Sequence, residues 1–95
     1  PGLYIKGAYG IRIENLIAVT KLSRPDSADR DIYGFETLTL VPLDQKLIDI
    51  TLMEEKEINW LERYNSRVRE ALMPLVDPET RPWLHRATAS PRSYR

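Results

Sequence analysis

The feature that most restricts the fold of this chain is an apolar stripe in its second half. Apolar side chains recur there at spacings of three and four; they are Ile58, Leu61, Tyr64, Val68, Leu72 and Leu75. This spacing places them on one face of a helix, and Pro74, which lacks a backbone donor, should end it. The pattern therefore predicts an amphipathic helix from about Glu54 to Met73, with Thr51 and Glu54 spaced as a capping box at its start.

The first half has the alternation and the composition of β-strands. We expect short strands at Leu3–Ile5 and Phe35–Val41 and a longer strand at Ile11–Leu22. The polar residues 23–34 should connect the last two strands, and the turn residues 6–8 should follow the first. Strands followed by helices predict an α+β fold.

The remaining segments are short. Leu47–Ile50 reads as an extended piece. Asp77 and the proline after it are placed to begin a helix over residues 81–88, which should bury Trp83 and Leu84. Residues 90–95 read as a frayed tail.

Composition limits the class of function. The chain has 95 residues, 42% of them hydrophobic, which is enough for one small globular domain. Its 14 basic and 14 acidic residues cancel, so charge predicts neither nucleic acid nor an anionic membrane as a partner. There is no cysteine and His85 is the single histidine, which excludes disulfides and Cys/His zinc sites. The absence of cysteine is typical of a reducing compartment.

Arg12 and Glu14 are the charged residues that most need an explanation. They lie two positions apart in a segment that is otherwise largely apolar, so in a strand their side chains share one face. Such a pair is either an exposed ion pair, worth less than about 1 kcal/mol, or part of the wall of a site. The residues alone leave both interpretations open.

Five motifs then follow one another along the chain. They are "PGLY", "GIRIEN", "FETLTLVP", "LID" and "INWLERYNSRVRE", between Pro1 and about Thr88. In this order they resemble the C-terminal part of the Xaa-Pro aminopeptidases (aminopeptidase P), which are dinuclear metallopeptidases with a pita-bread fold. The resemblance implies that residues 1–43 are the last antiparallel strands of a catalytic domain and that residues 44–95 are a helical C-terminal extension. Because the chain opens on Pro-Gly without an initiator methionine, we expect it to be a piece of a longer polypeptide.

The resemblance also assigns roles to the charged pair. In this family two aspartates, one histidine and two glutamates hold two divalent metal ions, usually manganese. Glu14 resembles the last glutamate, which bridges both ions, and Arg12 resembles the arginine that points into the same site and orders the polar groups around the metals. The other ligands would lie outside these residues, so the 95-residue chain alone is expected to be inactive. One departure is Asn65, where family members often have histidine.

The function that the resemblance implies is release of the N-terminal residue from peptides with proline in second position. The reaction would use a hydroxide shared between the two metals, in a cytoplasmic homodimer whose partners are peptide substrates and the remainder of the parent chain. A non-catalytic pita-bread homologue that binds peptides or proteins is the alternative, and the retained Glu14 weighs against it. A free-standing α+β interaction domain is disfavoured because the chain starts within a motif.

Overall fold

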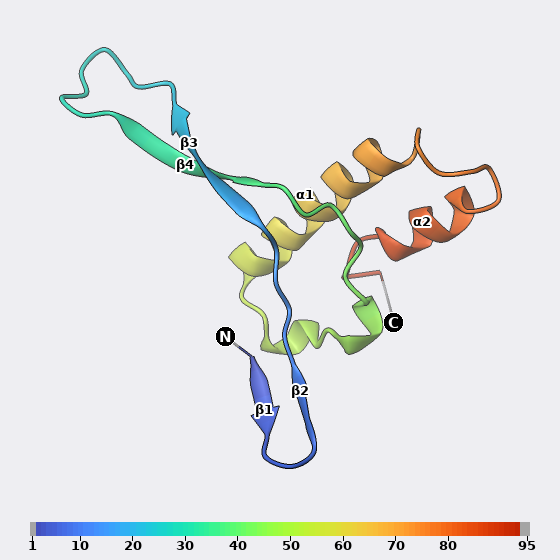
Figure 1. Ribbon diagram of the computed structural model, residues 1–95. Coiled ribbons are helices and arrows are strands. Elements are labelled where there is room, and N and C mark those ends of the chain that lie inside the picture. The colour runs from blue at the N-terminus through green and yellow to red at the C-terminus, as the bar shows by residue number, and fades with distance from the viewer. Residues whose placement is uncertain (1, 94–95) are drawn as a thin grey trace. The chain divides into compact units, whose positions relative to one another are not determined.

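The computed structural model describes residues 2–93, which form two compact units, one up to Thr39 and one from Leu40 onward. The strands and helices, in order, are β1 (Leu3–Ile5), β2 (Tyr9–Ile11), β3 (Ile17–Leu22), β4 (Ile32–Thr37), α1 (Glu55–Leu72) and α2 (Arg81–Ala87) (Figure 1). All four strands belong to the first unit and both α-helices to the second, which confirms the predicted α+β class. Within the described residues, no helix has both the length and the apolar character needed to cross a membrane.

The first unit contains two separate antiparallel hairpins. In the first, β1 and β2 pair from Leu3 opposite Ile11 to Ile5 opposite Tyr9. Gly7 lies in the loop between them with φ of 73°, a backbone conformation that side chains with a Cβ rarely adopt. The expected turn at residues 6–8 is confirmed.

The second hairpin joins β3 to β4, with Ile17 opposite Thr37 and Leu22 opposite Ile32. The strand predicted at Phe35–Val41 therefore starts three residues earlier and ends at Thr37. Beyond Thr37, the N–H groups of Leu38 and Thr39 both bond to the Leu16 carbonyl oxygen. The backbone N–H and C=O of Val41 bond to the Tyr64 hydroxyl instead of to a neighbouring strand.

The long strand predicted over Ile11–Leu22 is wrong in its middle, because Arg12–Leu16 has no regular strand structure. A strand residue needs a neighbouring strand to bond its N–H and C=O groups. The pairing of β1 ends opposite Ile11, and the pairing of β4 ends opposite Ile17. Between these two points, Leu16 bonds to Leu38 and Thr39, but no strand among the described residues pairs with residues 12–16.

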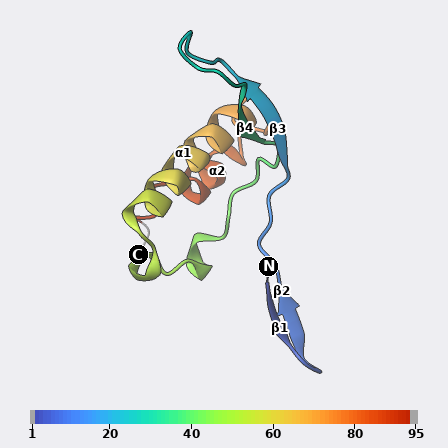
Figure 2. The same ribbon diagram turned by 90° about the vertical axis from the view of Figure 1, so that its left-hand side faces the viewer.

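The second unit is built around α1, and Figures 1 and 2 both show α2 alongside it. Four members of the predicted stripe are at most 7% exposed: Ile58, Leu61, Tyr64 and Val68. Further apolar side chains pack against the cluster formed by Leu61, Tyr64 and Val68; they are Leu40, Leu43, Ile48, Met53 and Leu72. Leu75, the last predicted member, is 79% exposed because α1 ends at Leu72, before it. The helix and its buried face are otherwise as predicted.

The segment before α1 differs from the prediction. Two short 3-10 helices, Gln45–Leu47 and Ile50–Leu52, replace the expected extended piece. Each begins after an aspartate that accepts a hydrogen bond from the backbone two residues on, at 3.0 Å for both Asp44 and Asp49. Such local bonds favour turns over extended backbone.

The start of α1 also differs from the predicted capping box. Its N-cap is Glu54, and the partner of that residue is Glu57, not Thr51. The Glu57 carboxylate accepts from the Glu54 N–H at 2.8 Å. The Glu57 carboxylate therefore satisfies one of the backbone N–H groups that every helix start leaves without a partner inside the helix.

Helix α2 begins after Thr80, not at Asp77. The Asp77 carboxylate instead closes the preceding turn by accepting from the N–H and the hydroxyl of Thr80, both at 2.8 Å, and these bonds lower the pKa of Asp77. Leu84 is 1% exposed, as predicted, whereas Trp83 is 53% exposed. Adjacent helical residues point about 100° apart, so the two side chains do not bury against the same neighbour.

Candidate functional site

The charged pair singled out from the sequence lies in the unpaired segment between β2 and β3. Arg12 Nη2 and Glu14 Oε1 form an ion pair, so the structure brings the two side chains together. Both are half exposed, at 57% and 51% of their side-chain surface. A pair this accessible contributes little to stability. Because the Glu14 side chain is half exposed, its carboxylate is also accessible to another partner.

The described residues provide only part of a metal centre. Within residues 2–93, no group of three or more histidine, cysteine, aspartate or glutamate side chains is placed to hold a metal ion. Glu14 has the chemistry of a ligand for a hard divalent ion, since each of its oxygens can contact a metal. The described residues therefore offer one accessible carboxylate with suitable ligand chemistry, and they do not by themselves form a complete metal site.

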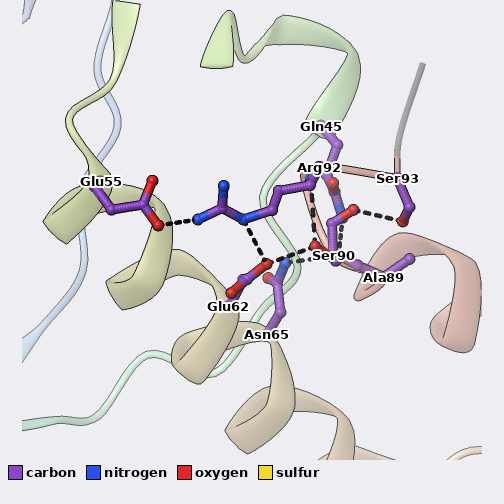
Figure 3. A network of polar contacts seen from close by, with 8 residues as sticks. All are labelled: Gln45, Glu55, Glu62, Asn65, Ala89, Ser90, Arg92 and Ser93. Carbon is purple, nitrogen blue, oxygen red and sulfur yellow. Dashed lines mark hydrogen bonds and ion pairs between the residues drawn. The ribbon is translucent and has the colours of Figure 1, made fainter. Parts of the chain in front are cut away.

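A second polar cluster, which sequence reasoning missed, holds the end of the described chain on α1. Ser90 Oγ donates to the Glu62 carboxylate at 2.6 Å, and the Arg92 guanidinium pairs with both Glu55 and Glu62 (Figure 3). The contact with Glu55 raises the pKa of Arg92. The frayed tail predicted for residues 90–95 is thus wrong for residues 90–93, while Tyr94 and Arg95 lie outside the described residues.

Two buried amides complete this cluster. Gln45 is 7% and Asn65 is 2% exposed, and both donate to the carbonyl oxygen of Ala89, at 2.9 and 3.2 Å (Figure 3). Gln45 Oε1 and Asn65 Oδ1 are buried without a hydrogen-bond partner within the described part of the chain. A signal for Asn65 was present in the sequence, because this polar residue falls between Leu61 and Val68 on the apolar face of α1.

The second cluster does not resemble a catalytic centre. Its carboxylates are engaged by Ser90 and Arg92, and its amides bond to backbone carbonyls. These contacts join three stretches of chain: the segment before α1, α1 itself and the end of the described chain. Of the two clusters, the pair of Arg12 and Glu14 is therefore the candidate functional site.

Comparison with known proteins identifies the family of this chain. The family model described as the C-terminal region of peptidase_M24 matches residues 31–90, more than half of the chain. The chain therefore belongs to the peptidase M24 family, and its residues 31–90 match the C-terminal region of that family.

Individual relatives and one solved structure point to a narrower group within this family. A probable Xaa-Pro aminopeptidase P from Laccaria bicolor is 36% identical over 89 residues, which are 90% of this chain and 14% of the relative. Aminopeptidase P1 from Lotus japonicus is 41% identical over 90 residues, which are 93% of this chain and 14% of the relative. The crystal structure of X-prolyl aminopeptidase from Caenorhabditis elegans matches with a TM-score of 0.77 and 36% identity. The match covers 95% of this chain and 15% of that chain, which is described as a cytosolic enzyme with a di-nuclear active site. The chain thus spans about one seventh of the length of these proteins, and the predicted relationship to aminopeptidase P is confirmed.

Proposed function

We propose that this chain is the terminal part of a metal-dependent Xaa-Pro aminopeptidase. The full-length protein would release the N-terminal residue from peptides whose second residue is proline. The observation that carries the proposal is the half-exposed carboxylate of Glu14, held beside Arg12, in a chain that is 36–41% identical to proteins named for this activity. Residues 1–43 would belong to the catalytic domain and residues 44–95 to its helical extension, a boundary close to the one between the two compact units after Thr39.

Glu14 would supply one metal-binding carboxylate. Two divalent ions, which we propose to be Mn²⁺, would when bound polarise the scissile carbonyl and lower the pKa of the attacking water. The oxygen chemistry of a carboxylate suits such ions. The other ligands would come from the rest of the full-length protein, so the 95-residue chain by itself should neither bind metal tightly nor cleave peptides.

Arg12 would position the carboxylate. Its guanidinium already contacts Glu14 Oε1, and a guanidinium presents several N–H donors in a fixed plane. A carboxylate held in this way keeps one orientation toward a metal and loses less freedom on binding. We expect Arg12 to act through Glu14 rather than on the substrate.

We place the full-length protein in the cytosol as a homodimer. The cytosolic placement follows the related Caenorhabditis elegans enzyme, which is described as cytosolic. The homodimer rests on the resemblance to aminopeptidase P. Gel filtration with light scattering tests the dimer, and fluorescence imaging of the tagged protein tests its location.

The decisive experiment substitutes Glu14 in the full-length protein. Glu14→Gln keeps the size of the side chain but removes its charge, so metal content per subunit should fall and hydrolysis of a Xaa-Pro peptide should fall at least a hundredfold. Metal analysis by mass spectrometry reads the binding role independently of turnover. Glu79→Gln is the matched control, because Glu79 is an exposed glutamate in the turn before α2.

Two results would contradict the proposal. Full metal content and full turnover in the Glu14→Gln protein would remove Glu14 from the site. A wild-type full-length protein that holds no divalent metal and cleaves no Xaa-Pro peptide would instead match a binding module that has lost catalysis.

A further inference from the structure

A pocket of about 460 Å³ lies within the second unit, and its lining includes neither Arg12 nor Glu14. One wall is the segment Pro42–Lys46, and the other is formed by Trp83, Arg86 and Ala87. These three residues are spaced by three and four, so they share one face of α2. Gln45 joins the two walls, since its buried amide donates to the carbonyl oxygen of Ala87 at 3.1 Å. The pocket is therefore held in shape by a contact across its own walls.

Each wall contributes a cation. Lys46 stands on one wall and Arg86 on the other, and both residues are exposed. Neither side chain takes part in an ion pair among the described residues. The acid of the lining, Asp44, accepts from the backbone N–H of Lys46 at 3.0 Å. Two cations and one carboxylate leave the lining with one net positive charge.

The rest of the lining is apolar and partly open. Trp83 exposes 53% of its surface although Leu84 beside it is buried, and the half-buried Pro42 and Leu43 lie on the opposite wall. An accessible tryptophan is a common anchor for a binding partner, because it offers a large rigid surface at little entropic cost. A partner that fits this pocket must therefore combine an anionic group with an apolar one.

We propose that this pocket binds an acidic peptide segment of a partner protein, in which an aspartate or glutamate lies next to a large apolar residue. The carboxylate would lie between Lys46 and Arg86, and the apolar side chain would pack on Trp83. Pairing with two cations from opposite walls selects a carboxylate over a neutral amide. The site needs neither the metals nor a free peptide N-terminus, so it is separate from the proposed catalytic function.

The experiment uses the full-length protein and fluorescein-labelled peptides with an acetylated N-terminus. One peptide contains Leu-Asp at its centre and the other contains Leu-Asn, and acetylation removes the free amine that an aminopeptidase requires. In fluorescence polarisation the Leu-Asp peptide should bind about tenfold more tightly, because only its carboxylate pairs with the cations. Lys46→Glu and Arg86→Glu should each weaken binding of the Leu-Asp peptide at least tenfold.

The controls separate this site from general charge effects and from loss of folding. Arg63→Glu makes the same charge change at an exposed position of α1 outside the pocket, so it should leave binding intact. Turnover of a Xaa-Pro peptide should be unchanged in all three variants, which also shows that they fold. Equal binding of the two peptides, an equal loss with Arg63→Glu, or no binding of either peptide because the rest of the protein covers the pocket would each overturn the proposal.

Discussion

The hydroxyl of Tyr64 ties the start of the second unit to its central helix. Tyr64 is 5% exposed, and its hydroxyl donates to the carbonyl oxygen of Val41 at 2.9 Å and accepts from the N–H of Val41 at 3.3 Å. Tyr64→Phe removes both bonds but keeps the ring, which stacks on Trp60 with centroids 5.2 Å apart. Each neutral hydrogen bond contributes about 0.5–1.5 kcal/mol net. Because Val41 is 57% exposed, water can replace the lost partner, so the variant should lose about 1–2 kcal/mol of local stability.

Hydrogen exchange measured by mass spectrometry on the full-length protein tests this magnitude. A loss of 1–2 kcal/mol corresponds to about 5–30-fold faster exchange in peptides that cover residues 40–53. Tyr33→Phe is the control, since Tyr33 lies on β4 and is 60% exposed. Unchanged exchange in Tyr64→Phe, or an equal change in both variants, would show that the two bonds do not stabilise this segment.

Three further predictions concern single side chains. Hydrogen bonds from Thr80 lower the pKa of Asp77. The stabilisation by this carboxylate is therefore present above the ordinary aspartate pKa and is lost as the pH falls. Melting curves of wild type and Asp77→Asn should differ at neutral pH and converge in acid. Glu62→Ala removes the acceptor of Ser90, so residues 88–93 should exchange their amides faster, and unaltered exchange would argue against an anchoring role. Asn65→Ala removes the donor to the Ala89 carbonyl oxygen at a position that is 2% exposed, so denaturant titration should show a loss of about 1–3 kcal/mol, and unchanged stability would refute this account.

The interruption of the strand determines the surroundings of the ion pair of Arg12 and Glu14. If residues 12–16 had continued a paired ladder, both side chains would have projected from the surface of a sheet. Without a paired strand among the described residues, this segment instead presents a carboxylate and its guanidinium partner on backbone that has no regular secondary structure. Such a segment can contribute a ligand to a site whose other groups come from another part of a longer protein.

The features that sequence alone predicted correctly are those that depend on local order along the chain. The periodicity of α1 specified its buried face, and Gly7 marked the turn of the first hairpin, because helices and tight turns satisfy their backbone groups among residues close in sequence. Arg12 and Glu14 do pair, although the strand from which their shared face was predicted is absent at these residues; the family motifs supplied the proposed role.

Tertiary structure decided the rest. The break between β2 and β3 depends on where other strands stop, and the exposure of Trp83 depends on which face of α2 is buried. The anchoring of residues 90–93 depends on side chains that lie about 30 positions earlier in the chain, such as Glu62. Strand pairing and polar contacts of this kind join residues that are distant in sequence, so no local pattern of propensity or periodicity encodes them.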